Sequence, residues 1–300
     1  MKTRISVHLF LALLLIVPLT LFARDITPVV STEWVEKNLD NAKLRIIDIR
    51  KVEEYKEGHI PGAVSAFYGT WAIKRGDLQN ELPALDDLAD TITSAGISRE
   101  SLVVVVGKAD NAGELTNISR VAWTLAYAGL SNVSILDGGY NKWMAEKRQV
   151  SQETTKPTSS DYKPVWNKAI VVNKDYVLQR MKKAALVDVR LPDYFFDVSK
   201  FDFVAKPGHI PGAVCLPSTW IFTKDGTFKG KEDLEAMAAG VIGKDKSKEI
   251  IVYCDTGKVC TAWWYILTEV LGYKNVKTYD GSTEEWAKDP KAPFVKYTWK

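Results

Sequence analysis

The feature that most limits the possible folds is a seven-residue segment that occurs twice in the chain. The sequence GHIPGAV at residues 58–64 returns letter for letter at residues 208–214. An identical repeat after 150 residues (208 minus 58) indicates that one domain has been duplicated. A chain of 300 residues has room for two domains, so we expect two copies of one fold in tandem.

Two further motifs accompany the repeated segment in both halves. IDIR at 47–50 corresponds to VDVR at 187–190, and DGG at 137–139 corresponds to DGS at 280–282. A tryptophan follows each of the last two motifs, Trp143 or Trp286, and we expect both to pack in the core. The region around residues 151–168 is rich in Ser, Thr, Lys and Pro, which is typical of a linker. We therefore predict one domain over 24–148, a linker over 149–168 and a second domain over 169–300.

The first 23 residues are predicted to be a secretory signal peptide. Lys2 and Arg4 form a short positive region, an apolar run covers 9–22, and the small residue Ala23 precedes the charged start of the mature chain. The apolar run is shorter than a membrane-spanning helix needs, so we expect cleavage and no membrane anchor afterwards. The protein is then exported, to a periplasm, where its thiols meet an oxidising compartment.

Each half predicts an α/β domain, a mainly parallel sheet flanked by helices. Continuous apolar runs are expected to form strands buried on both faces, at 45–49, 102–106, 186–189 and 249–253. Amphipathic stretches between them, such as 233–239 and 261–271, are expected to form helices, and Gly272 ends the second. Alternation of strands and helices indicates crossover connections between parallel strands.

Composition excludes several classes of function. The formal charge of +3 falls to about +1 (+3 minus 2) once Lys2 and Arg4 are removed, so no strong positive field attracts nucleic acid. Three cysteines and three histidines supply neither a disulfide framework nor four zinc ligands at finger spacing. We predict no metal and no organic cofactor.

The candidate nucleophile is Cys254, at the end of the predicted strand 249–253. Cysteine at the carboxyl end of a parallel strand, before a glycine-containing loop and a helix, lies where α/β sheets bind ligands. Loop N–H groups, the helix start and Lys258 are all expected to stabilise a thiolate, and equally a negatively charged persulfide. The predicted binding loop comprises Asp255, Thr256, Gly257, Lys258, Val259 and Cys260.

The chain resembles the tandem-domain rhodanese sulfurtransferases over nearly all of its mature length. The resemblance rests on the Asp-x-Arg strand ends, the Gly-His-Ile-Pro-Gly-Ala segments, the Cys-x-x-Gly loop and the Asp-Gly turns before tryptophan. It implies that Cys254 takes sulfane sulfur from a small donor as a persulfide and passes it to a thiophilic acceptor such as cyanide or a thiol. It also implies that only the second domain is active, and the first has Gly107-Lys108-Ala109-Asp110 at the equivalent place and no cysteine.

Departures from the family pattern leave the donor open among thiosulfate, 3-mercaptopyruvate and polysulfide. The thiosulfate-using enzymes commonly have a basic residue after the cysteine, where this chain has Asp255. Two-domain relatives also place an arginine four residues after the Asp-x-Arg arginine, where this chain has Tyr194. An alternative is therefore a persulfide carrier or partner-binding module with little turnover, whose first domain recognises a protein.

Two other chemistries would use the same cysteine. Phosphatases of this fold carry an arginine six positions after the cysteine, whereas Cys260 stands there, so the clamp for phosphate is missing. Cys260 itself either packs at the helix start or forms a disulfide with Cys254, as in a thiol redox protein.

Several residues near the site are expected to be structural. Asp188 and Arg190 support the site by bracing neighbouring loops, and His209 has a twin, His59, in the cysteine-free copy, which favours a role in loop structure over that of a base. Cys215 is expected to pack beside the sheet. Trp263 and Trp264 are expected to contribute at least one core side chain, whereas Trp34 and Trp220 are candidates to line the pocket.

Overall fold

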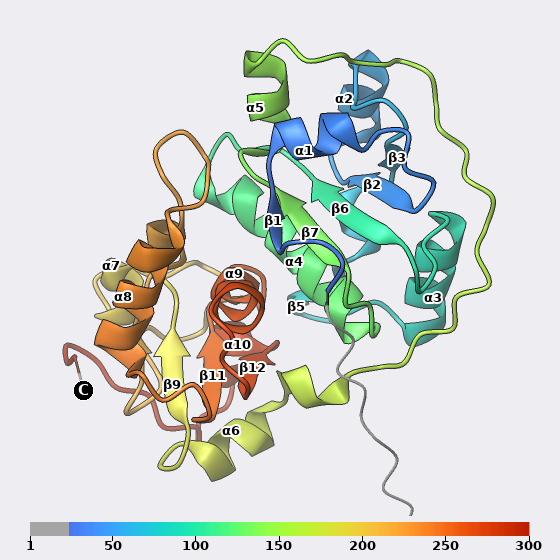
Figure 1. The fold of residues 1–300 in the computed structure, drawn as a ribbon. Helices are drawn as coiled ribbons and strands as arrows, with labels where there is room; N and C mark the ends of the chain where they lie inside the picture. Colours follow the sequence, from blue (N-terminus) through green and yellow to red (C-terminus); the bar gives the residue numbers. More distant parts are fainter. Residues whose placement is uncertain (1–23, 300) are drawn as a thin grey trace, which may run out of the picture.

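The computed structural model describes residues 24–299 and places them in two α/β domains (Figure 1). The predicted signal peptide at 1–23 lies outside the described residues. The first sheet has the order β1-β7-β6-β2-β3 and the second the order β10-β9-β11-β12-β8. Read in reverse, the second order is β8-β12-β11-β9-β10, so each strand has the place of its counterpart in the first sheet. All strand pairs in these two sheets are parallel. The predicted duplication of an α/β domain is confirmed.

The strands of the two sheets occupy equivalent places in the two halves. They are β1 (Val29–Val30), β2 (Leu44–Asp48), β3 (Val64–Ser65), β6 (Leu102–Val106) and β7 (Val133–Leu136), then β8 (Val171–Val172), β9 (Ala185–Asp188), β10 (Val214–Cys215), β11 (Ile250–Tyr253) and β12 (Val276–Tyr279). The central strands β6 and β11 are buried at every position because helices cover both faces of each sheet.

The helices lie on the two faces of the sheets (Figure 1). The α-helices are α1 (Thr32–Lys37), α2 (Val52–Glu57), α3 (Leu85–Ser94), α4 (Ala112–Tyr127), α5 (Gly139–Ala145), α6 (Lys174–Arg180), α7 (Pro192–Phe195), α8 (Lys231–Ile242), α9 (Cys260–Tyr265) and α10 (Ser282–Trp286). Short 3₁₀ turns are η1 (Tyr68–Thr70), η2 (Lys168–Ile170) and η3 (Ser218–Ile221). The helix predicted over 261–271 is α9 continued by a π-helical turn, η4 (Ile266–Val270), and Gly272 with φ of +76° ends it.

The segment between the domains follows the outer face of the first domain (Figure 1). Residues 152–167 form no helix or strand, but they are hydrogen-bonded to the first domain along their length. The Tyr162 hydroxyl donates to the Ala128 carbonyl at 2.8 Å, and the Ser160 hydroxyl donates to the Ile97 carbonyl at 2.6 Å. Although its composition is that of a linker, this segment is packed onto the domain that precedes it.

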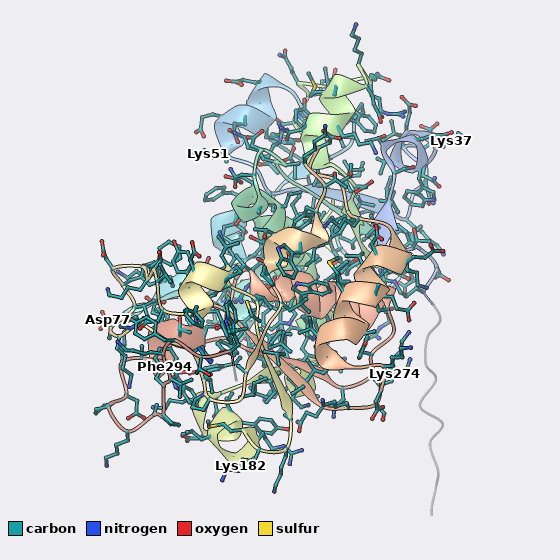
Figure 2. The ribbon with its side chains drawn as sticks, turned by 90° about the vertical axis from the view of Figure 1, so that its left-hand side faces the viewer. Lys37, Lys51, Asp77, Lys182, Lys274 and Phe294 are labelled. Carbon is teal, nitrogen blue, oxygen red and sulfur yellow. The ribbon has the colours of Figure 1, made fainter. Side chains whose placement is uncertain are left out.

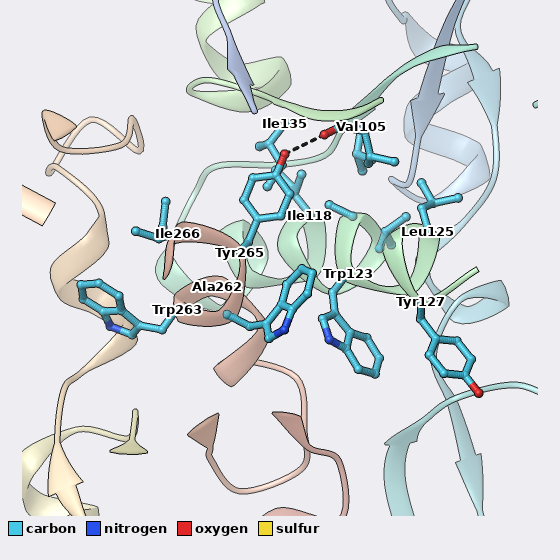
Figure 3. Packing of buried hydrophobic residues seen from close by; sticks show 14 of the residues in the cluster. Val105, Ile118, Trp123, Leu125, Tyr127, Ile135, Ala262, Trp263, Tyr265 and Ile266 are labelled. Atoms are coloured by element: carbon cyan, nitrogen blue, oxygen red, sulfur yellow. Dashed lines mark hydrogen bonds between the residues drawn. The ribbon is translucent and has the colours of Figure 1, made fainter. Parts of the chain in front are cut away.

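One hydrophobic core runs across the boundary between the domains. Helix α4 of the first domain packs against α9 of the second, and Figure 3 shows Trp123 and Ile118 beside Ala262 and Tyr265. The Tyr265 hydroxyl donates a hydrogen bond to the carbonyl of Val133, the first residue of β7, at 2.8 Å, which ties α9 to the first sheet. The two domains therefore share buried apolar surface rather than meeting through polar contacts alone.

A hairpin of the first domain extends over the second. Strands β4 (Ile73–Arg75) and β5 (Leu78–Glu81) are antiparallel and are joined by Gly76 and Asp77, with Gly76 at a φ of +57°. Figure 2 shows Asp77 among second-domain residues, near Phe294 and far from Lys37 and Lys51 of its own domain. Lys288 donates to the Asp77 carbonyl at 3.0 Å, so the hairpin is fixed there.

No helix among residues 24–299 combines the length and the apolar character required to cross a membrane. Within the same residues, no three His, Cys, Asp or Glu side chains are grouped as metal ligands.

Candidate active site

Cys254 directly follows β11, in the middle of the second sheet, and its side chain is only 1% exposed. The loop then turns through Gly257, with φ of +72°, into α9, which begins at Cys260. A Cβ atom at Gly257 would collide with the Asp280 carbonyl, so glycine is required both for the turn and for this close approach. The predicted strand-loop-helix arrangement around the cysteine is therefore present.

The surroundings of the Cys254 sulfur favour its thiolate. Burial raises the pKa of the Cys254 thiol, but hydrogen bonds from the Cys260 thiol and from the N–H groups of Cys260 and Thr256 bring it below the ordinary value. The negative charge of Asp255 opposes this lowering. Burial and the contact with Cys254 raise the pKa of Cys260 far above its ordinary value, so Cys260 remains the proton donor of the pair.

Lys258 lies within the electrostatic reach of the same sulfur. Burial lowers the pKa of the Lys258 ammonium, while the charge on Cys254 and on Glu114 acts in the opposite direction. The Lys258 ammonium and the Cys254 thiolate therefore stabilise each other's charged form. The backbone N–H groups and the Cys260 thiol act on the sulfur itself.

Ser282 is part of the site and was not identified from the sequence. Its hydroxyl oxygen accepts the N–H groups of Cys254 and Gly257, both at 3.1 Å, and lies 3.8 Å from the Cys254 sulfur. Ser282 has a φ of +49°, and its counterpart in the first domain is Gly139 with a φ of +57°. The sequence signal for Ser282 is that the DGS motif has serine where its repeat partner DGG has glycine. Serine is uncommon in left-handed backbone, so its presence there points to a role for the hydroxyl.

Arg120 reaches the back of the active loop from the first domain. This residue of α4 is fully buried, donates to the Gly257 carbonyl at 2.8 Å and forms an ion pair with Asp280. Its guanidinium also lies 4.6 Å from the centre of the Trp123 ring. The first domain thus supplies the cation that neutralises Asp280 and holds the loop that carries the cysteine.

The hairpin supplies a second contact from the first domain. The Asn80 side chain, at a φ of +55°, donates to the Thr256 hydroxyl at 3.0 Å. The Tyr68 hydroxyl in turn donates to the side-chain amide oxygen of Asn80, Oδ1, at 2.8 Å. Asn80 and Arg120 therefore reach the loop from different elements of the cysteine-free domain.

Asp255 is held beside the cysteine by groups of its own domain. Its carboxylate lies 3.5 Å from the Arg190 guanidinium and accepts a hydrogen bond from the Thr283 hydroxyl at 3.1 Å. Burial is the largest influence on its pKa and, together with Asp188, raises it to about 6 against the effect of Arg190. At neutral pH the carboxylate form predominates.

Asp188 and Arg190 brace the site, as expected from their repeat partners. Arg190 bonds both carboxylate oxygens of Asp188 and donates to the Gly208 carbonyl at 2.8 Å. The first domain has the same arrangement between Arg50, Asp48 and the Gly58 carbonyl. The pair therefore anchors the repeated GHIPGAV segment in both copies.

The two histidines also have matching structural contacts. His209 bonds the Phe195 carbonyl at 2.8 Å and stacks on the Phe195 ring at 3.8 Å. His59 bonds the Tyr55 carbonyl at 2.7 Å and stacks on Tyr55 at 3.7 Å. Burial lowers the pKa of His209, and in both copies the ring is held by a carbonyl group and a stacked aromatic side chain, which is a packing role.

The remaining candidate residues form no hydrogen bond with the Cys254 sulfur in the part of the chain that the structure describes. Burial raises the pKa of Cys215 to about 12, and its thiol donates to the Arg190 carbonyl, so it is an inert packing residue. Trp263 and Trp264 are both buried, as are Trp143 and Trp286. Trp34 packs on the first-domain core, and Trp220 is 43% exposed.

The first domain has no space for a nucleophile at the equivalent position. Gly107 follows β6, and its carbonyl accepts the Tyr140 N–H as the Cys254 carbonyl accepts that of Thr283. A Cβ atom at Gly107 would lie 2.8 Å from Ile118 and 3.1 Å from Ile49. Apolar side chains therefore fill the volume that a cysteine side chain would need.

The family model described as the rhodanese-like domain matches the chain twice, at residues 31–146 and 173–289. A Mycobacterium leprae protein named as a thiosulfate sulfurtransferase is 34% identical over 278 residues, covering 86% of this chain and 93% of its own length. The sulfur carrier protein TtuD of Thermus thermophilus is 32% identical over 282 residues, covering 89% of this chain and 96% of its own.

Among solved structures, the 3-mercaptopyruvate sulfotransferase SseA of Escherichia coli is similar, with a TM-score of 0.73 and 27% identity. The similarity covers 86% of this chain and 99% of that one.

Proposed function

This chain belongs to the rhodanese family and is a sulfurtransferase, and we propose that Cys254 is the residue that carries the transferred sulfur. The observation that supports this role is the set of hydrogen-bond donors around its sulfur, which lowers the thiol pKa despite burial. A thiolate is the reactive form of cysteine, and the same donors suit the terminal anion of a persulfide. The first domain has no cysteine with which to share this role.

The proposed reaction has two steps with the enzyme as carrier. The Cys254 thiolate attacks the outer sulfur of the donor, forming the Cys254 persulfide as the bond to the donor breaks and the donor leaves with that electron pair. A thiophilic nucleophile, such as cyanide or a thiolate, then attacks the outer persulfide sulfur and regenerates the thiolate. Loop N–H groups, the Cys260 thiol and Lys258 stabilise the negative charge in both states.

Intact mass measurement tests this assignment. The full chain, incubated with thiosulfate, 3-mercaptopyruvate or polysulfide, should gain one sulfur that cyanide removes as thiocyanate. The variant Cys254→Ser should gain none, whereas the matched variant Cys215→Ser should behave as the unaltered protein. Sulfur transfer that survives in Cys254→Ser would show that another residue carries the sulfur.

The sulfur donor follows from the charge beside the nucleophile. Asp255 places a carboxylate next to Cys254 and opposes the approach of a small dianion such as thiosulfate. We therefore propose as the preferred donor a singly charged persulfide, or a polysulfide, whose two charges lie at opposite ends of a longer chain. The mass experiment tests this order, because polysulfide should load the cysteine at lower concentration than thiosulfate.

A persulfide carrier that serves a protein acceptor is the second candidate. The Asp255 carboxylate favours it, because a negative charge beside the sulfur disfavours small anionic donors and acceptors. A loaded protein that transfers its sulfur to cyanide slowly, and to a partner protein rapidly, would support the carrier function.

Export is a further part of the proposal. The charged, apolar and small residues at 1–23 have the order found in secretory signals. Expression of the full chain should yield a mature protein that begins near Arg24 in the exported fraction. A protein that retains its first residues and stays with the cytoplasm would contradict export.

A further inference from the structure

A cavity of about 920 Å³ lies at the junction of the two domains, behind the active loop. Its walls come from the β4–β5 hairpin, the start of α3, Tyr127 at the end of α4, strand β8, and the Asp280-Gly281 turn. Cys254 does not line it. The volume is in the range of small-molecule binding sites, so the cavity is large enough for an organic ligand.

The cavity has apolar sides and carboxylates at its inner end. Its apolar lining includes Ile73, Leu78, Leu82, Val171 and Val172. The charged groups that line the cavity and are at least partly buried are all acidic, namely Glu81, Asp280 and Glu285, whereas Arg75, Asp87 and Lys168 are exposed at its rim. A ligand that enters fully therefore meets apolar surface and negative charge.

Glu81 is the carboxylate of the three that has neither an ion pair nor a hydrogen-bond donor within the described part of the chain. Asp280 is paired with Arg120, and Glu285 accepts a hydrogen bond from the Tyr279 hydroxyl at 2.8 Å. The Glu81 Oε1 atom is buried and has no hydrogen-bond partner, and no Lys, Arg or His among residues 24–299 lies within 4.0 Å of this carboxylate. Buried polar atoms are nearly always paired, so this carboxylate oxygen at the cavity wall is available to accept a hydrogen bond from a molecule that enters the cavity.

Burial raises the pKa of the Glu81 carboxyl to about 7, and the charges that act on it are those around the cavity. Asp280 and Glu285 raise it, while Arg120 and Arg75 lower it. A cation bound in the cavity would reverse this balance and favour the ionised form of Glu81.

We propose that this cavity binds a small organic amine, with its ammonium group on Glu81 and its apolar part against the hairpin and β8. An inorganic cation would leave the apolar sides uncovered. An organic anion would place its charge among three carboxylates. The site is distinct from the sulfur but touches the active loop through Asp280, because Arg120 bonds both Asp280 and the Gly257 carbonyl.

Calorimetric titration of the full chain with three matched ligands tests the proposal. Benzylamine, benzyl alcohol and benzoate share one ring and differ in charge. We expect benzylamine to bind at least about tenfold more tightly than benzyl alcohol, and benzoate to show no binding. Equal affinities for all three, or preference for benzoate, would overturn the proposal.

The variant Glu81→Gln identifies the carboxylate, with Glu235→Gln as a surface control on α8. Glu81→Gln should weaken benzylamine about tenfold or more and leave sulfur loading of Cys254 unchanged, whereas Glu235→Gln should bind as the unaltered protein. Unchanged benzylamine affinity in Glu81→Gln would refute the site. Failure of sulfur loading in the unaltered protein would instead count against the proposed function, independently of amine binding.

Proton release in the unaltered protein gives a test that needs no variant. Because the amine favours ionised Glu81, whose pKa is raised to about 7, binding should release protons around and below pH 7 and fewer as the pH rises to 8. Titrations in two buffers of different ionisation enthalpy, repeated between pH 5 and pH 8, measure this number. Binding without proton release at any pH in this range would show that the amine does not sit on Glu81.

Discussion

Replacement of Arg120 by methionine should destabilise the protein more than any other single change at the domain boundary. The substitution keeps much of the side-chain volume but removes the cation from a fully buried site. It leaves Asp280, which is 7% exposed, without its ion pair and the Gly257 carbonyl without its donor. Removal of one partner of a buried pair typically costs about 3–5 kcal/mol, and a lost hydrogen bond adds about 1 kcal/mol.

A double-mutant cycle separates the pair from the rest of the side chain. Most of the loss should come from the charge left on Asp280, so Arg120→Met in an Asp280→Asn background should cost clearly less than Arg120→Met alone. Urea unfolding, followed by tryptophan fluorescence, gives the free energies. The exposed Arg99 of the same domain provides the control, and Arg99→Met should change stability by no more than about 0.5 kcal/mol. A loss below about 1 kcal/mol in Arg120→Met, or equal losses in both backgrounds, would refute the reasoning.

Three further changes have outcomes that the site predicts. The Asp255 pKa of about 6 lies above its ordinary 3.8, so ionisation of this carboxyl opposes folding. Between pH 4 and pH 7 the free energy of unfolding of the unaltered protein, measured with urea, should fall by up to about 3 kcal/mol relative to that of Asp255→Asn. Parallel pH profiles of the two proteins would contradict this. Cys260→Ala should raise the Cys254 pKa, read from the pH dependence of alkylation by iodoacetamide, while Cys260→Ser should restore much of the lowering; an unchanged midpoint in the alanine variant would exclude the thiol as a donor. Ser282→Ala removes the acceptor of two buried N–H groups and should destabilise by about 1–3 kcal/mol for each, so a fully stable variant would show that other groups satisfy them.

The parts of the site that lie close together in the sequence could be predicted from it. The strand before Cys254, the glycine turn and the helix after it form one continuous segment, and their apolar runs and glycine position are visible in the letters. The roles of Arg190 and His209 could also be predicted, because each has a twin in a copy without the nucleophile. A residue present in both copies, only one of which has the nucleophile, serves the fold rather than the chemistry.

The contacts from the first domain could not be predicted in this way. Arg120 and Asn80 lie 137 and 176 residues from their partners in the active loop, and no local periodicity reports such a distance. The β4–β5 hairpin has no repeat partner in the second sheet, so the duplication gave no sign of it. Arginine is rarely buried, so the sequence of α4 favours a solvent-exposed position for Arg120. Its burial among the apolar residues of this helix was therefore not predicted.

The position of Arg120 on the first domain has a consequence for how the protein is made. All five strands of the first sheet lie within residues 29–136, so this part of the chain leaves the ribosome before β11. The Arg120 guanidinium can be enclosed only when Asp280 arrives with the second domain. The groups that hold the active loop from behind therefore depend on the last part of the chain, and a chain that stops before residue 280 contains Cys254 without the finished loop around it.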